Sequence, residues 1–124
     1  MTEYKLTGTV KKFSQEGRKL GYPTANIECE ANAPEGVFVG YTKLINKRLP
    51  SIIFVGTPIT LGETLKRAES HILDYEDKDL YGQSIQIEIE RKLRDNEKFN
   101  SRVDLIKQMK QDEQLARKYF ENHK

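Results

Sequence analysis

The sequence predicts a mainly β protein: a six-stranded antiparallel barrel of the Greek-key type, with a C-terminal α-helix packed against it. Two observations lead to this prediction. Short segments of alternating apolar and polar residues are separated by Gly, Pro and Asn, which is typical of strands and turns. Near residue 101 the apolar spacing changes to three and four, which indicates one terminal helix. Closing the strands into a barrel removes the exposed edges of an open sheet.

The strands are expected in the first three quarters of the chain. Residues 84–93 are the clearest, because Ile85, Ile87 and Ile89 face one side and polar residues face the other. The other strands are expected at residues 4–11, 25–29, 36–45, 51–55 and 66–74, with a turn at residues 46–48.

The C-terminal helix is predicted to begin after Ser101. Ser101 and Asp104 have the spacing of a capping box, in which the Ser101 hydroxyl accepts a backbone N–H. Apolar residues then recur over about five turns at 3.6 residues per turn. The charged residues of this segment, Asp112 and Glu113 among them, are expected on the helix face in contact with water.

Length and composition limit the class of protein. The 124 residues are enough for one domain, expected to span residues 1–124, and too few for two independent cores. The net charge of +2 is too balanced to indicate a nucleic-acid or membrane-surface role. Residues 1–5 contain no signal-peptide stretch, and no run approaches the roughly 20 apolar residues that span a bilayer. We therefore expect a cytoplasmic monomer with neither nucleic-acid nor membrane partners.

The loop before the second expected strand is the segment best suited to chemistry. Gly17 and Gly21 allow a tight turn and bring backbone N–H groups near an anion, and Arg18 and Lys19 add positive charge. By spacing alone, an ordinary turn is the simpler interpretation. The loop has neither the Walker pattern nor the βαβ setting of a dinucleotide-binding loop.

The exit of this loop has two side chains suited to bind a metal ion. Pro23 stiffens the chain, and Thr24 and Asn26 point to the same face of the extended segment that follows. A hydroxyl and an amide oxygen are hard neutral ligands, suited to a Mg²⁺ that also binds phosphate and water.

Residues 17–26 resemble the signature of the riboflavin kinases, in which a Gly-Arg pair leads through Leu-Gly-Phe/Tyr to Pro-Thr-Ala-Asn. The Pro-Thr-Ala-Asn element is highly specific to that family. The resemblance implies that Thr24 and Asn26 bind the magnesium of MgATP. It also implies nucleotide contacts for Gly17, Arg18, Lys19, Gly21 and Pro23.

Residues 68–74 and 79–82 are similar to the family's Glu-x-His strand and its Leu/Phe-Tyr-Gly turn. The resemblance implies that Glu69 is the catalytic base and that Tyr81 contacts the nucleotide. A carboxylate suits this role, because it can accept the proton of an alcohol that attacks phosphorus. Without the family, Glu69 and His71 are also compatible with a solvated polar stripe on one strand face.

Residues 92–101 are similar to the family's Leu-Arg-x-x-x-x-Phe-x-Ser element, which precedes the C-terminal helix. In the family this loop is a flap over the flavin, which implies flavin contacts for Leu93, Arg94 and Phe99. Without the resemblance, a strand-to-helix connection with a solvated Arg94 explains the segment.

Together the matches imply a stand-alone riboflavin kinase, which uses ATP and Mg²⁺ to convert riboflavin to FMN, releasing ADP. The sequence departs from the family pattern at Phe13, Glu16 and Phe54. These departures leave an alternative open, namely a degenerate flavin- or nucleotide-binding module of the same fold without kinase activity. A barrel that binds single-stranded nucleic acid is a further rival. It would need aromatic and basic residues interleaved on an exposed strand face, which Tyr41 and Lys43 alone hardly supply.

Overall fold

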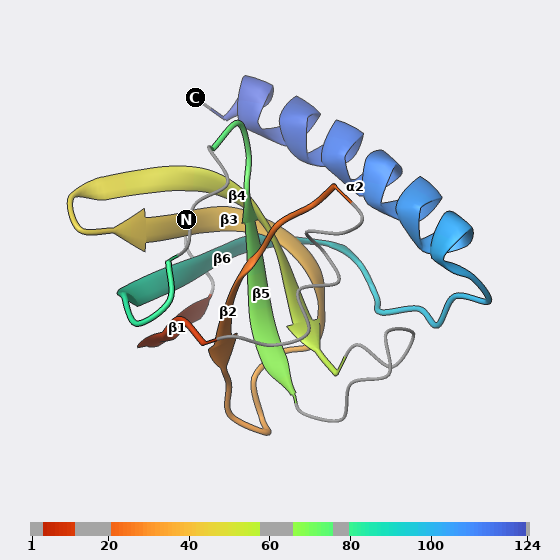
Figure 1. Cartoon of the computed structure of the whole chain (residues 1–124). Coiled ribbons are helices and arrows are strands. Elements are labelled where there is room, and N and C mark those ends of the chain that lie inside the picture. Colours follow the sequence, from red (N-terminus) through yellow and green to blue (C-terminus); the bar gives the residue numbers. More distant parts are fainter. Residues whose placement is uncertain (1–3, 12–20, 58–65, 76–79, 124) are drawn as a thin grey trace.

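The computed structural model describes residues 4–11, 21–57, 66–75 and 80–123. Within them, six antiparallel strands form one sheet in the order β1-β6-β3-β4-β5-β2, which curls into a nearly closed barrel (Figure 1). The elements are β1 (Tyr4–Thr9), β2 (Ala25–Glu28), β3 (Gly36–Leu44), β4 (Lys47–Gly56), β5 (Arg67–Ile72), β6 (Ser84–Arg94) and α2 (Arg102–Asn122). The predicted fold class, a mainly β antiparallel barrel with a C-terminal helix, is confirmed.

The barrel closes where the two outermost strands of the sheet, β1 and β2, approach each other. The backbone amide of Lys11, just beyond β1, donates a hydrogen bond of 2.8 Å to the carbonyl of Asn26 in β2. This contact places Asn26 at the closure of the barrel, between β1 and β5.

The barrel interior holds the apolar members of each alternating strand. On β6, Ile85, Ile87 and Ile89 are each no more than 2% exposed, as the alternation predicted. On β5 the inward residues include Ala68 and Ile72, so Glu69 and His71 face the outside of the barrel.

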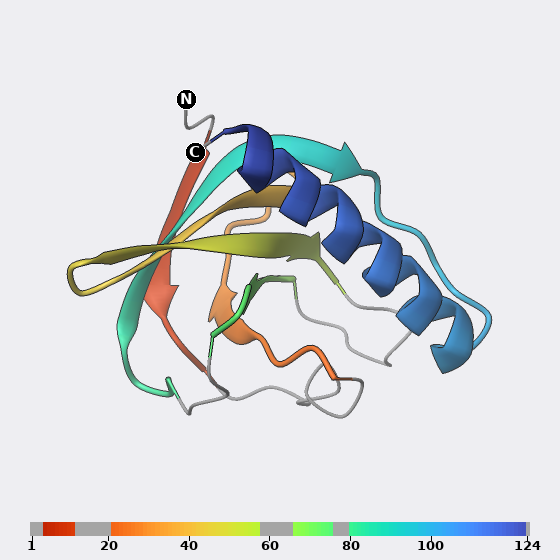
Figure 2. The ribbon, with the colours of Figure 1, turned by 90° about the horizontal axis from the view of Figure 1, so that it is seen from above.

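The helix α2 lies along the outside of the barrel (Figure 2) and contacts β4 and β6. The Ser101 hydroxyl accepts a hydrogen bond of 3.2 Å from the amide of Asp104, which confirms the predicted N-cap. Ala116 is fully buried, and Phe120 packs edge-on against Tyr41 with ring centroids 5.4 Å apart. Among the described residues no helix is long and apolar enough to cross a membrane.

The turn predicted at residues 46–48 is misplaced. Leu44 pairs directly with Lys47, so the connection is a two-residue turn of Ile45 and Asn46, and β4 begins at Lys47. Ile45 has φ of 52°, a conformation that β-branched residues rarely adopt. The sequence pattern therefore indicated a turn in the polar residues that follow Ile45.

Candidate active site

The β2–β5 cluster consists of Thr24, Asn26 and Glu69, on the outer face of the barrel. The Thr24 hydroxyl lies 3.3 Å from Asn26 Oδ1 and 3.2 Å from Glu69 Oε1, within hydrogen-bonding distance of both. Asn26 and Glu69 are directly opposite each other in the β2–β5 pairing, and they are 5% and 8% exposed. The structure thus brings together the two expected metal ligands and the expected base.

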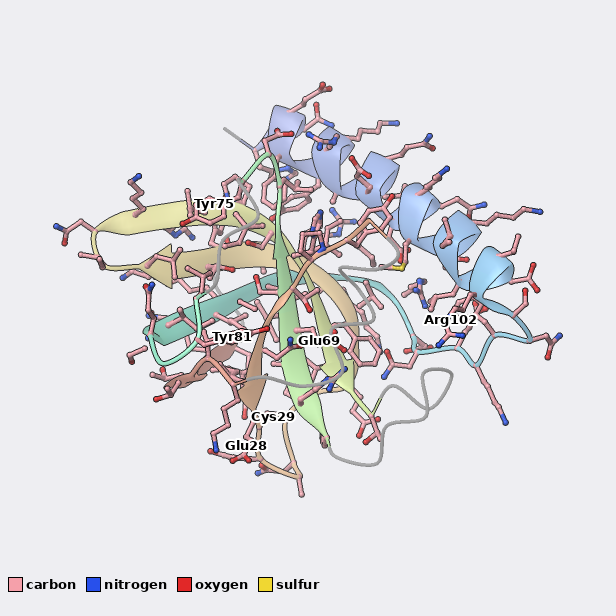
Figure 3. All side chains as sticks on the ribbon, in the orientation of Figure 1. Glu28, Cys29, Glu69, Tyr75, Tyr81 and Arg102 are labelled. Carbon is pink, nitrogen blue, oxygen red and sulfur yellow. The ribbon has the colours of Figure 1, made fainter. Side chains whose placement is uncertain are left out.

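The alternation of the two strands explains why these side chains meet. Ala25 and Ile27 of β2 point into the core, so Asn26 points outward. Ala68 of β5 also points inward, so Glu69 points outward next to Asn26. Figure 3 shows Glu69 on β5, beside β2.

A positive charge lies beside the carboxylate. Arg67, two residues before Glu69 on β5, is 2% exposed, and its Nε lies 3.3 Å from Glu69 Oε2. No motif in the sequence had pointed to Arg67. The two-residue spacing from Glu69 on a strand was the signal that could have found it.

The oxygen atoms of the cluster fit a hard cation such as Mg²⁺. In an octahedral site with ligands at about 2.1 Å, neighbouring ligand oxygens lie about 3 Å apart. The distance from Thr24 Oγ1 to Asn26 Oδ1, 3.3 Å, is close to that value. Within the described residues, no three His, Cys, Asp or Glu side chains could hold a metal together. The Thr24 hydroxyl and the Asn26 amide oxygen are two neutral donors, which suits an ion that arrives with phosphate and water ligands.

The exit of the glycine loop is attached to both β5 and α2. Nδ1 of His71 lies 2.8 Å from the carbonyl oxygen of Pro23, and its ring packs edge-on against Tyr22 at 5.2 Å. The Tyr22 hydroxyl donates a 3.0 Å hydrogen bond to Glu113 on α2. Burial, together with this hydrogen bond, raises the pKa of Tyr22 to about 12. The backbone just before Thr24 is thus held on two sides.

Glu113 also accepts a hydrogen bond from a cation on its own helix, Arg117. Arg117 Nε donates to its Oε2 at 2.9 Å, and the Arg117 guanidinium forms a bidentate pair with Asp74 after β5. Burial by itself acts to raise the pKa of Glu113, but the hydrogen bonds from Arg117 and Tyr22 outweigh it, and the net pKa lies below its usual range.

The other expected nucleotide residues are divided between described and undescribed segments. Gly21 has φ of 90°, as a glycine in a tight turn can. Tyr81, on the turn before β6 (Figure 3), is 37% exposed. The amide of its neighbour Gly82 donates a 2.9 Å hydrogen bond to the carbonyl of Val10, directly before the bridge residue Lys11. The predictions for Gly17, Arg18 and Lys19, and the departures at Phe13 and Glu16, lie outside the described residues.

On the expected flavin side, Arg94 is engaged with the helix. Its Nε and Nη2 donate to the two carboxylate oxygens of Asp112, both at 2.9 Å, and this pair is the helix ion pair. The guanidinium carbon lies 5.7 Å from the ring centroid of Phe99. Leu93 is the preceding residue of β6, half-buried. The expectation that Asp112 faces water is wrong, because it is 4% exposed beneath α2.

The sheet separates Arg94 from the β2–β5 cluster. Arg94 pairs with Val37, Val37 with Phe54, and Phe54 with Glu69, so one row crosses four strands. At about 4.8 Å per strand, Arg94 and Glu69 start roughly 14 Å apart along this row. The register therefore places Arg94 three strands away from Glu69. Phe54, which departs from the family pattern, is the residue next to Glu69 on β4.

These features define a small antiparallel-barrel protein in which a carboxylate, a hydroxyl and an amide oxygen lie close together near the closure of the barrel. The chain belongs to the riboflavin kinase family, because the family's model, described as Flavokinase, riboflavin kinase, matches residues 1–120.

Curated relatives agree with this assignment. The chain is 36% identical to the trifunctional protein RibF/MnmA of Mycoplasmoides gallisepticum, over 97% of this chain and 19% of that protein. It is 33% identical to the RNA-binding riboflavin kinase RibR of Bacillus subtilis, over 94% of this chain and 51% of that protein. It is also 33% identical to the bifunctional riboflavin kinase/FMN adenylyltransferase of Escherichia coli K12, over 94% of this chain and 38% of that protein. The chain thus spans about half the length of these relatives or less.

A solved structure shares the fold. The chain matches the crystal structure of a macrolide-efflux protein from Streptococcus pneumoniae with a TM-score of 0.77 and 29% identity, over 91% of this chain and 38% of that one.

Proposed function

We propose that this chain is a riboflavin kinase, which transfers the γ-phosphate of ATP to the 5′-hydroxyl of riboflavin and forms FMN and ADP. The observation that supports the proposal most is the β2–β5 cluster. Thr24 Oγ1 lies within 3.3 Å of both Asn26 Oδ1 and Glu69 Oε1 in a chain of the riboflavin kinase family.

In the proposed reaction, Glu69 orients the 5′-hydroxyl and accepts its proton as the oxygen attacks the γ-phosphorus. The bond from that phosphorus to the β–γ bridging oxygen breaks, and ADP leaves. Thr24 and Asn26 would hold Mg²⁺, which neutralises phosphate charge when it is bound. Most of the acceleration would come from positioning and charge neutralisation.

The remaining proposed contacts surround this centre. The glycine loop, with Gly17, Arg18, Lys19, Gly21 and Pro23, would hold the phosphates, and Tyr81 would contact the nucleotide. On the acceptor side, Leu93 and Phe99 would contact the flavin. Arg94, which is bonded to Asp112 and lies beside Phe99, would also contact the flavin.

We also propose that the chain is a single domain over residues 1–124 that acts as a cytoplasmic monomer. Its small-molecule partners would be riboflavin, FMN, ATP and ADP, without nucleic acid or membrane. The RNA-binding property in the name of the Bacillus subtilis relative belongs to that protein, half of which the chain matches.

The test is direct. The purified chain is incubated with riboflavin, ATP and Mg²⁺, and the products are separated by chromatography. FMN and ADP in equal amounts are expected. Flavin fluorescence quenching without ATP consumption would instead show a degenerate binding module. If neither FMN formation nor quenching is observed, the proposal is rejected.

A further inference from the structure

Arg67 is a buried cation next to the proposed base. Because it precedes Glu69 by two residues on β5, both side chains leave the strand on the same outer face. The Arg67 side chain is 2% exposed, and that of Glu69 is 11% exposed. A guanidinium removed from water is tolerated where a negative partner stays close. The burial of Arg67 therefore favours an arrangement in which the Glu69 carboxyl group remains beside it.

The two oxygens of Glu69 have different neighbours. Oε1 lies 3.2 Å from the Thr24 hydroxyl, and Oε2 lies 3.3 Å from Arg67 Nε. The terminal torsion of a glutamate is soft, so a carboxylate without neighbours samples many orientations. A hydroxyl on one oxygen and a cation beside the other restrict that rotation.

The geometry points to Arg67 as a positioning residue for Glu69. It holds Oε2, so that Oε1 stays on the side of Thr24, where the hydroxyl to be phosphorylated would lie. In this role Arg67 touches no reacting atom and acts only through the carboxylate. The inference rests on the proposed function, and it assigns a task to a residue to which the resemblance gives no role.

A double-mutant cycle on the full chain tests the role. Arg67→Met, Arg67→Lys, Glu69→Gln and the double variant Arg67→Met/Glu69→Gln are compared in steady-state FMN formation. Arg67→Met is expected to lower kcat about 10- to 100-fold, the scale of a misplaced catalytic group. The KM values for riboflavin and ATP should change less than about threefold, because binding contacts remain. Arg67→Lys should recover most of kcat.

The double variant is the decisive measurement. If Arg67 acts through Glu69, the double variant is no slower than Glu69→Gln alone, since the carboxylate that Arg67 positions is already gone. If the fold-reductions in kcat of the two single variants multiply in the double variant, the inference is overturned. A rise in KM without a fall in kcat in Arg67→Met would also overturn it. Arg48→Met is the matched control: Arg48 pairs with Glu88 at 2.7 Å on the outer face of β4 and β6, and its loss should leave kcat unchanged.

Two further outcomes keep the test decisive. If Arg67→Met does not fold, Arg67→Lys is compared with Arg67→Gln. A lower kcat in Arg67→Gln than in Arg67→Lys supports the inference, and equal kcat values in the two variants overturn it. If the unsubstituted chain forms no FMN, the proposed function fails and this role fails with it. An active chain with a fully active Arg67→Met variant rejects the role of Arg67 alone.

Discussion

The β2–β5 cluster and the helix ion pair bind their charges in different ways. In the cluster, the Thr24 hydroxyl lies 3.2 Å from Glu69 Oε1, which is long for a strong hydrogen bond, and Arg67 Nε lies 3.3 Å from Oε2 as an ion pair. In the helix ion pair, Arg94 and Asp112 share two parallel bonds of 2.9 Å. Bidentate pairs of this length are among the stronger polar contacts in proteins. Long contacts exchange readily for a ligand, whereas short bidentate contacts fix a scaffold.

The difference also separates what each region does for the molecule. Asp112 and its neighbour Glu113 connect α2 to both sides of the proposed site, through Arg94 and through Tyr22. The helix thus holds the segments that flank the cluster without entering it. We expect substitutions of Thr24 and Glu69 in the cluster to change turnover, and substitution of Asp112 in the helix ion pair to change stability with little change in turnover.

The largest expected effect is on turnover in Glu69→Gln. The amide keeps the shape of the side chain but cannot accept the proton, so kcat should fall by about 10²- to 10⁴-fold, the usual scale for loss of a general base. Steady-state FMN formation measures the change. Because the buried Arg67 loses the negative charge of Glu69 in this variant, the free energy of unfolding should also fall, by up to about 3 kcal/mol, so kcat is measured well below the unfolding transition.

Glu88→Gln is the control for this substitution. Glu88 is also buried on the outer face, at 5% exposure, but it lies on β6 and pairs with Arg48. It should lose stability and keep kcat. Full activity in Glu69→Gln would remove Glu69 from the mechanism.

The next effect is on folding stability in Asp112→Asn. Removal of this charge leaves the Arg94 guanidinium, 18% exposed, without its bidentate partner. The free energy of unfolding should fall by about 3 kcal/mol, the lower part of the range for breaking a buried pair. Urea denaturation measures the loss. Below the unfolding transition kcat should stay within about threefold of the unsubstituted value, if the pair is a scaffold.

The double variant Arg94→Met/Asp112→Leu sharpens this test. Replacing both charges with apolar groups of similar size often restores stability, because no charge stays buried alone. A double variant as unstable as Asp112→Asn would indicate that the pair contributes more than its mutual charge satisfaction.

Local patterns predicted the cluster better than the helix ion pair. Period-two alternation places Asn26 and Glu69 on outer strand faces, and the resemblance assigns their roles. The register that sets them opposite each other is a long-range property, which no local pattern contains. Asp112 was assigned to the wet face because its burial depends on where α2 docks and on the distant Arg94. The position of the β3–β4 turn could not be predicted from the sequence, because Ile45 has a φ that is atypical for its residue type.

A smaller effect is expected on metal dependence in Thr24→Val. Valine keeps the shape and removes the hydroxyl oxygen, so the Mg²⁺ concentration for half-maximal rate should rise at least about 10-fold. Titration of Mg²⁺ at saturating ATP and riboflavin measures the shift. Thr7→Val, on the exposed face of β1, is the matched control and should leave the titration unchanged. Equal Mg²⁺ dependence in Thr24→Val and the control would show that Thr24 is no ligand.

The smallest effect is the pH dependence of stability in Glu113→Gln. The pKa of Glu113 lies below its usual range, because the hydrogen bonds from Arg117 and Tyr22 outweigh the opposing effect of burial. A carboxyl group whose pKa is lowered by folding stabilises the protein above its unfolded pKa of about 4.3, and this contribution disappears as the pH falls below that value. The unsubstituted chain should therefore exceed Glu113→Gln by up to about 1 kcal/mol near pH 7, since the group is partly exposed.

That difference should close as the pH approaches 3. Urea midpoints measured at several pH values between 3 and 7 test this expectation, with the exposed Glu121→Gln as control. Asp74 remains paired with Arg117 in the variant, and the pKa of Asp74 is also lowered by that hydrogen bond, so some acid dependence persists. A difference between the two chains that is constant with pH would assign the effect of Glu113 to packing rather than to charge. In that case α2 would hold the Tyr22 side of the site by shape, and only its Arg94 side by an ion pair.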